Sequence, residues 1–281
     1  MAVVVRSAAA TGSSGYLTTN RWESDGDSLR LRVHAEPVGH WPERGDDFPD
    51  PMVDPTLPSE EYRELVRRNG SRSLARIGLD WELPAESSRV EWFGTGPGEA
   101  YPDSRHAVRV GRFRATVDEL QTPYVRPQEN GNRADIRWAA FTDGAGTGLC
   151  IVGEEPFHFA ARRWTDQQLD AARHHNDLVP GPVIHLHTDH AVQRLGTAAV
   201  GPGVLPQHRL ELASADFTFI LTPPAAELRP PSGPPHRRPW CSGPLRAPMT
   251  RPCLGPMRGP RLILRRSRHV QTAKLPVWED C

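Results

Sequence analysis

Alternation between apolar and polar residues is the strongest pattern in this sequence. Leu29, Leu31 and Val33 alternate with arginines, and Ile184 and Leu186 alternate with histidines. An apolar residue at every second position is what a half-buried antiparallel strand requires. Clusters of glycine, proline, aspartate and asparagine separate such segments, which predicts an all-β antiparallel sandwich. The same alternation recurs at residues 77–83 and 209–212.

One helix interrupts the strand pattern. Thr165 and Gln168 have the spacing of a capping box, in which each side chain bonds the backbone amide of the other residue. Leu169 and Ala172 then supply a narrow apolar stripe. We therefore expect a helix that begins after Thr165 and ends near His175.

Composition divides the chain into three parts. We expect a disordered leader at residues 1–19, in which the stretch to Gly15 is small and polar, and a β-sandwich domain at 20–222. Within that domain, the Pro- and Asp-rich stretch 42–73 predicts a long loop or insertion, with a short helix at 60–68. In residues 223–281, 13 of 59 residues are proline and no periodicity survives, so this Pro/Arg-rich tail is expected to be disordered.

Charge is distributed unevenly, although the formal net charge is +0. The tail has 11 basic and 3 acidic residues, a net of +8, and the rest has 23 basic and 31 acidic residues, a net of −8. A basic tail can bind nucleic acid or anionic lipid, but this one lacks interleaved aromatic residues and helical amphipathicity. We therefore expect no nucleic-acid partner and no membrane partner. Lys274 is the only lysine of the chain, which indicates a GC-rich genome, and the tail resembles such a gene read out of frame.

Cysteine usage and hydropathy indicate the compartment. Three of the four cysteines lie in the tail, and no Cys-x-x-Cys pair exists, so the sequence predicts neither a zinc ribbon nor a redox motif. No run of 18 apolar residues occurs, and the apolar run near the N-terminus is too short for a signal peptide. We expect a cytoplasmic protein that spans no membrane.

Three motifs point to a known family. They are WFGTGPGEAYPD at residues 92–103, PYVRPQENGNRADIRW at 123–138, and LGTAAVGPGV followed by LPQHRL at 195–210. In this order they resemble the small-chain domain, the C-terminal domain 5, of family 2 β-galactosidases. The resemblance covers residues 20–222. It implies a galactose mutarotase-like β-supersandwich, which in this chain is incomplete at its N-terminus.

The resemblance also implies a function. Members of that family hydrolyse terminal non-reducing β-D-galactose residues, as in lactose catabolism. Their two catalytic glutamates lie on a (β/α)8 barrel, and their magnesium and sodium sites also lie on other domains. We therefore expect no catalytic residue and no bound cofactor in this chain, and no activity of the chain alone. A galactoside substrate is expected only beside such a barrel, which a large β-galactosidase subunit would supply.

A few residues are candidates for contact with substrate. By motif alignment, Val200 and Gly201 lie where the family extends a loop over the mouth of the active site, so they are candidates for the pocket wall. Valine offers no aromatic plane to a sugar ring, and Arg194 stands where a glycine is expected. Glu129 and Asn130 are candidates for sugar contacts, but they belong to a Glu-Asn-Gly turn, and holding that loop is the role we favour.

Histidines are frequent but do not form a metal-binding pattern. His185 and His187 share one face of a predicted strand, and His174, His175 and His190 are near in sequence. Zinc requires three or four convergent ligands, and a pair at i and i+2 on a polar strand face is more simply solvated. We therefore predict no metal site.

Three alternative functions stay open. A free-standing carbohydrate-binding module would need side chains such as Trp92, Tyr101 and Trp138 on a concave face, although the alternation places Trp92 in the core. A self-contained hydrolase would have to pair acids such as Glu99 and Glu129. A non-functional remnant of a β-galactosidase gene would account for missing first strands and for the unusual tail.

Overall fold

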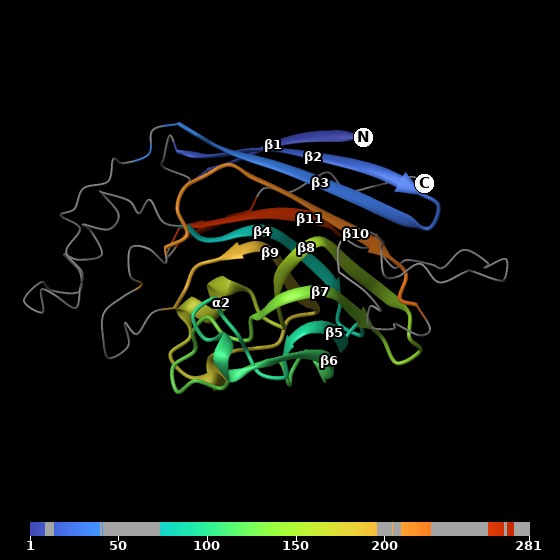
Figure 1. Ribbon diagram of the computed structural model, residues 1–281. Coiled ribbons are helices and arrows are strands. Elements are labelled where there is room, and N and C mark those ends of the chain that lie inside the picture. Colours follow the sequence, from blue (N-terminus) through green and yellow to red (C-terminus); the bar gives the residue numbers. More distant parts are fainter. Residues whose placement is uncertain are drawn as a thin grey trace, which may run out of the picture.

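The computed structural model describes residues 1–8, 14–39, 41, 74–195, 204, 209–225, 258–266 and 269–272. These residues form an all-β fold with a single short α-helix, so the predicted fold class is confirmed (Figure 1). The predicted insertion at 42–73, with its helix at 60–68, lies outside them.

Twelve strands are present in the described residues. The helix is α2 (Asp166–Ala171), and two 3-10 turns are η1 (Arg105–Ala107) and η2 (His175–Asp177). The strands are β1 (Ala2–Ala8), β2 (Gly15–Asp25), β3 (Ser28–Val38), β4 (Leu74–Pro84), β5 (Arg89–Gly96), β6 (Arg109–Thr116), β7 (Arg133–Thr142), β8 (Gly148–Arg162), β9 (Val183–Val192), β10 (Ala215–Thr222), β11 (Arg258–Arg266) and β12 (His269–Thr272).

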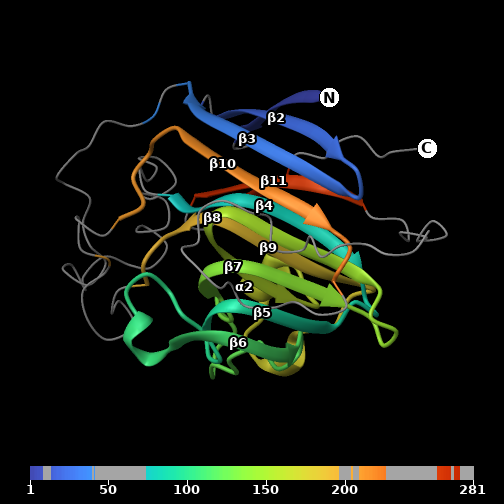
Figure 2. The ribbon, with the colours of Figure 1, turned by 45° about the vertical axis from the view of Figure 1, so that its right-hand side comes forward.

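The sheet divides at β8, the longest strand. Residues 150–153 of β8 pair with β10, and residues 158–162 pair with β9. One arm therefore continues through β10, β3, β2 and β1, and the other through β9, β4, β11 and β12, while β7, β5 and β6 extend the sheet beyond β8. All pairings are antiparallel, and Figures 1 and 2 both show β5 and β6 at the opposite end of the molecule from β1 and β2.

Apolar side chains of the two arms form one core. Leu31 of β3 and Phe219 of β10 belong to the same buried cluster as Leu79 of β4 and Leu186 of β9. The arms therefore face each other across this cluster, which is the arrangement of a β-sandwich. Trp92 of β5 is buried in the same cluster, as its alternation predicts.

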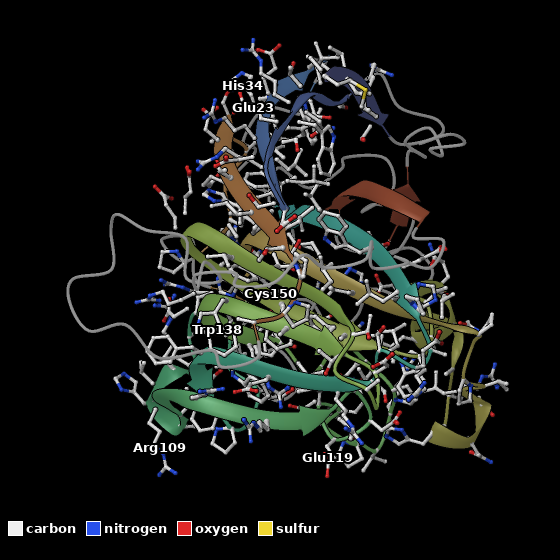
Figure 3. All side chains as sticks on the ribbon, turned by 90° about the vertical axis from the view of Figure 1, so that its right-hand side faces the viewer. Glu23, His34, Arg109, Glu119, Trp138 and Cys150 are labelled. Carbon is white, nitrogen blue, oxygen red and sulfur yellow. The ribbon has the colours of Figure 1, made fainter. Side chains whose placement is uncertain are left out.

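A second, smaller apolar cluster lies on the other face of β7 and β8. The residues that alternate with the core positions of these strands form it, together with one residue of β10. Figure 3 labels two members on neighbouring strands, Trp138 and Cys150. The cluster comprises Trp138, Ala140, Cys150, Val152 and Ile220.

The N-terminal end differs from the sequence prediction. β1 and β2 pair at seven positions, from Ala2 opposite Arg21 to Ala8 opposite Gly15. Tyr16 is fully buried, and its hydroxyl donates to the backbone of a residue far along the chain, at position 213. The prediction of a disordered leader is therefore wrong for residues 2–8 and 14–19. A strand of this kind depends on its partner strand, which local composition does not reveal.

The predicted disordered tail also contains strands. β11 pairs with β4, and β12 pairs with β11. The apolar run 262–264 is short, but it is long enough for a strand when β4 offers a free edge. Pro260 has no amide proton to donate, and the register shifts between Arg258 and Arg261. The prediction of disorder is wrong for these two segments.

The helix begins as predicted and ends early. Thr165 Oγ1 accepts the amide of Gln168 at 3.1 Å, and Gln168 Oε1 accepts the amide of Thr165 at 2.8 Å. α2 ends at Ala171, before the predicted end near residue 175. The reason is that Asp177 accepts the amides of residues 173 and 174, which bends the chain into η2.

Candidate functional site

The candidate site is the polar face of the arm formed by β8, β9 and β4. Alternation places Leu186 of β9 in the core and sends His187 and Asp189 to the opposite face. Arg76 of β4 and Arg162 of β8 lie on the same side. All four of these polar side chains are buried. Glu129 in the loop between β6 and β7 contacts Arg76, and Asp166 of the helix α2 contacts Arg162 and His187.

Glu129, in the loop between β6 and β7, bridges the two arginines. Its Oε1 lies 2.9 Å from Arg76 Nη2 and 3.2 Å from Arg162 Nη2. Arg76 Nη1 lies 3.2 Å from Asp189 Oδ2, and Arg162 Nη1 donates to Asp166 Oδ1 of α2 at 2.7 Å. These five residues, called the ion-pair cluster below, tie the loop and the helix to the sheet.

Burial and charge shift the pKa values in the ion-pair cluster in opposite directions. Burial raises the pKa of Glu129, but the guanidinium groups of Arg162 and Arg76 outweigh burial and hold that pKa well below its usual range. Asp189 behaves differently, because burial raises its pKa to about 6 in spite of Arg76. Glu129 is therefore an anion throughout the neutral range, whereas Asp189 takes up a proton near pH 6.

His187 lies between two further carboxylates. Its Nδ1 is 3.4 Å from Asp80 Oδ1 of β4, and its Nε2 is 3.3 Å from Asp166 Oδ2. Burial lowers the pKa of His187 to about 4, so the ring is neutral at neutral pH. The prediction that the histidines of this strand are solvated is wrong for His187, because the sheet face is covered, while His185 is half-buried.

The base of the loop between β6 and β7 is fixed by further hydrogen bonds. Arg133 Nη1 donates to the backbone oxygens of Leu120 and Gly131, both at 2.8 Å. Glu99 Oε2 accepts the amide of Gly131 at 2.7 Å. Gly131 has a φ of 77°, which favours glycine, so the chain makes its turn here.

Asn130 joins the two ends of the same loop. Its Oδ1 accepts the amide of Thr122 at 3.1 Å, and its Nδ2 donates to the backbone oxygen of Gln128 at 2.9 Å. Its own backbone oxygen accepts from Arg162 Nη2 at 3.1 Å. Both polar groups of the Asn130 side chain thus hold the loop.

Glu99 and Glu129 lack the properties of a catalytic carboxyl pair. A retaining glycosidase requires an acid whose pKa is raised and a second carboxylate that is free to attack the sugar. The pKa of Glu129 is lowered, and Glu129 is engaged by two arginines. Glu99 accepts from the Gly131 amide and the Tyr124 hydroxyl. This arrangement fixes a loop to a sheet and does not suit proton transfer.

The aromatic residues considered for sugar binding are buried. Trp92, Tyr101 and Trp138 are at most 1% exposed. Trp92 Nε1 donates to the backbone oxygen of Thr95 at 3.0 Å, and the Tyr101 hydroxyl lies 3.4 Å from Glu129 Oε1. An aromatic side chain binds a sugar through an exposed ring face. These three residues therefore do not line a concave sugar-binding face.

Two further predictions concern a metal site and the wall of the substrate pocket. Within the described ranges, no group of three or more His, Cys, Asp or Glu side chains is arranged to hold a metal ion. Val200 and Gly201, the candidates for the pocket wall, lie outside the described residues, between Leu195 and Val204.

Sequence reasoning missed most of the ion-pair cluster. Arg76, Arg162 and Asp189 occupy polar positions of strands, where alternation predicts solvent. One signal was present in the sequence, a glycine inside β4 at position 78, since a strand glycine marks a close approach of another group. A Cβ at Gly78 would lie 2.4 Å from Asp189 Oδ1. The covering elements, however, come from distant parts of the chain.

The chain forms an all-β sandwich domain. In its described residues, the ion-pair cluster joins a loop and a helix to the sheet. Residues 3–221 match the family model of the β-galactosidase small chain. The chain therefore belongs to the β-galactosidase small-chain family, and the resemblance of its motifs to a β-galactosidase small chain is confirmed. No helix among the described residues is long and apolar enough to cross a membrane.

Several curated relatives are β-galactosidases. The chain is 46% identical over 116 residues to that of Vibrio cholerae, covering 41% of this chain and 11% of the relative. It is 31% identical over 211 residues to the enzyme of Arthrobacter sp. (strain B7), covering 73% of this chain and 18% of the relative. It is 35% identical over 148 residues to that of Kluyveromyces lactis, covering 52% and 14%. The chain thus spans less than a fifth of the length of these relatives.

Proposed function

We propose that this chain is the C-terminal domain of a family 2 β-galactosidase from a GC-rich bacterium, and that it contributes packing and a wall of the substrate pocket. The reaction served would be hydrolysis of terminal non-reducing β-D-galactose residues, as in lactose. The observation that carries the proposal is the family match over residues 3–221 in a chain that spans 18% or less of the relatives described above.

The proposal assigns the chemistry to a different part of the enzyme. Hydrolysis with retention needs two carboxyl groups about 5–5.5 Å apart, one of them with a raised pKa. Glu129 is instead held as an anion by Arg76 and Arg162. The isolated chain is therefore expected to be inactive, and a barrel-bearing large subunit or segment is expected to supply the catalytic glutamates. We expect this assembly in the cytoplasm.

Within the proposed enzyme, the pocket wall is assigned to Val200 and Gly201. Valine would contribute an apolar contact to the sugar without an aromatic stacking plane. For Glu129 and Asn130 we propose the role of holding the loop between β6 and β7, because their oxygens and the Asn130 amide already have partners within the chain.

Complementation tests the proposed function directly. The Arthrobacter sp. enzyme would be expressed without the 18% that this chain matches, and its hydrolysis of a chromogenic β-galactoside would be measured with and without this chain. We expect no turnover by either piece alone and turnover when both are present. A matched control adds a heat-unfolded sample of this chain. Absence of turnover in the mixture, with both pieces folded, would count against the proposal.

A further inference from the structure

We propose that two copies of this chain pair through the outer edge of β1, the side of that strand that faces away from β2. The two strands run antiparallel, with Val4 of one copy opposite Val4 of the other. The inference goes beyond the proposed function, because it concerns a contact between two copies of this domain. β1 stands at the end of the strand order, and within the described residues it pairs with β2 alone.

Hydrogen bonds at the start of β1 show which backbone groups point to the outer edge. The Met1 amino group donates to the Trp22 backbone oxygen at 2.8 Å, and the Trp22 amide donates to the Met1 backbone oxygen at 2.7 Å. In an antiparallel pair, residues that exchange two bonds alternate with residues that exchange none. The backbone amides and oxygens of Ala2 and Val4 therefore point away from β2. The Val4 side chain is 60% exposed.

The other two edges of the sheet, as far as the structure describes it, are protected against pairing with another chain. β12 has four residues. β6 has arginines at three of its eight positions, 109, 112 and 114, and Glu119 Oε2 accepts the amide of Thr116 at its end at 2.7 Å. Short length, charged side chains and covering groups are the devices that prevent pairing at an edge. Residues 2–5 of β1, Ala-Val-Val-Val, carry no charge and favour a strand.

The residues of β1 suit a second copy of the same strand. In a two-fold contact, the residue on the symmetry axis faces its own copy. With Val4 on the axis, the outward backbone groups of the two Val4 residues face each other, and Ala2 lies opposite Arg6 of the other copy. An axis through position 6 would instead place two arginines opposite each other, which destabilises a sheet. The contact closes at two copies, because each β1 has one outer edge.

Proline at position 4 tests the contact and leaves the pairing of β1 with β2 intact. Because the Val4 amide points outward, Val4→Pro removes hydrogen bonds to the second copy alone. The matched control is Val110→Pro on β6, where the valine is 62% exposed. There the Val117 amide donates to the Ser88 backbone oxygen at 2.9 Å, so alternation also points the Val110 amide outward.

Sedimentation equilibrium of the full chain measures the dissociation constant of the dimer. Val4→Pro should raise that constant about 10-fold or more, because two hydrogen bonds between the copies are lost at the axis. Val110→Pro should change it less than about 2-fold, because β6 lies at the other end of the molecule (Figures 1 and 2). Thermal melting should stay unchanged in both variants, since an outward amide at an edge has no partner in its own sheet.

Two charge variants test the position of the axis. Val4→Lys and Val4→Glu each place like charges opposite each other, so each variant alone should stay monomeric. An equimolar mixture of the two should form dimers, because lysine then faces glutamate across the axis. A folding defect in either variant cannot produce dimers in the mixture.

Four results would overturn the inference. The unmodified chain could stay monomeric at every concentration, or Val4→Pro and Val110→Pro could weaken the dimer equally. The lysine and glutamate variants could fail to form dimers when mixed. A monomeric chain could also bind the truncated Arthrobacter sp. enzyme and lose that binding in Val4→Pro, which would assign the edge to a different partner. Complementation of that enzyme is measured separately, so the proposed function and this inference can fail independently.

Discussion

The two faces of the arm formed by β8, β9 and β4 are both buried, but they are built from opposite chemistry. The core face carries Leu79, Trp81 and Leu186, in contact with the other arm of the sandwich. The opposite face carries Arg76 and Asp189 beneath a loop and a helix. Apolar packing tolerates exchange of side chains of similar volume, whereas the charged face depends on each partner being present.

The charged face contains more acids than bases. Two guanidinium groups, Arg76 and Arg162, face four carboxylates around them, those of Asp80, Glu129, Asp166 and Asp189. Burial is the main cause of the raised pKa of Asp189, and the carboxylates of Glu129 and Asp80 raise it further. A catalytic role would require a mobile or accessible group, and the ion-pair cluster instead joins separate elements.

The largest effect is expected on the charged face. Arg162→Ala removes the partner of Glu129 and Asp166 and leaves buried charge uncompensated, which should lower the free energy of unfolding by about 3–5 kcal/mol. Chemical denaturation monitored by tryptophan fluorescence measures it. Arg163→Ala is the matched control, because Arg163 pairs with Asp118 at the surface and should cost less than about 1 kcal/mol. Equal losses of unfolding free energy in the two variants would contradict the structural role given to Arg162.

The core face is expected to respond through volume. Leu186→Ala should lower the free energy of unfolding by about 3 kcal/mol, because it leaves a cavity in the sandwich core. Leu195→Ala, at a half-exposed position, should change it by less than about 0.5 kcal/mol. A small loss in Leu186→Ala would mean that the two arms do not pack tightly against each other.

The burial of Asp189 and His187 predicts a pH dependence of stability with two opposing contributions. Between pH 3.8 and about 6 the folded chain keeps a proton on Asp189 that the unfolded chain releases, so this group favours folding increasingly as pH falls. Between pH 6.5 and about 4 the unfolded chain takes up a proton that folded His187 excludes, so this group disfavours folding as pH falls. Each contribution amounts to about 3 kcal/mol, and they offset each other.

Variants would separate these two contributions. From pH 6.5 to 4, Asp189→Asn should lose stability relative to the unmodified chain, and His187→Gln should gain stability relative to it. Denaturant midpoints of the unmodified chain and of each variant would be measured across that range. The difference between a variant and the unmodified chain reports the substituted group, because the other titrating groups contribute equally to both. Parallel pH profiles would show that neither group is buried as described.

The smallest effect is expected at the close approach of β4 to β9. Gly78→Ala would place a Cβ 2.4 Å from Asp189 Oδ1 and from the Thr188 backbone oxygen, which should lower the free energy of unfolding by about 2 kcal/mol. Gly98→Ala, with nothing within 4 Å of the new Cβ, is the control and should be nearly neutral. An unchanged melting temperature in Gly78→Ala would contradict the close approach.

The sequence predicted the elements better than it predicted their surroundings. Alternation identified the strands that contain Leu31 and Leu186, and the capping box located α2 at Thr165. Alternation did not identify β1, β11 and β12, because the hydrogen bonds that hold these strands come from partner strands and not from the segment itself. Propensity and period describe a segment, whereas pairing is decided between segments.

The charged face could not be predicted for a related reason. Glu129 and Asn130 stood out only through a turn motif, and nothing local placed Arg76, 53 residues earlier in sequence, against Glu129. A polar position on a strand implies solvent until another element is known to cover it. Whether another element covers a strand position depends on the tertiary structure. The local pattern of a single sequence does not reveal it, because loops have no periodicity.

We infer that the carboxylates of this chain serve its structure, and we propose that the glycosidic chemistry is supplied elsewhere. Hydrolysis of a chromogenic β-galactoside by the purified chain, measured beside the Glu129→Gln and Glu99→Gln variants, tests it most directly. We expect no turnover by any of the three proteins, and a lowered melting temperature for Glu129→Gln. Turnover by the unmodified chain that either substitution abolishes would contradict it.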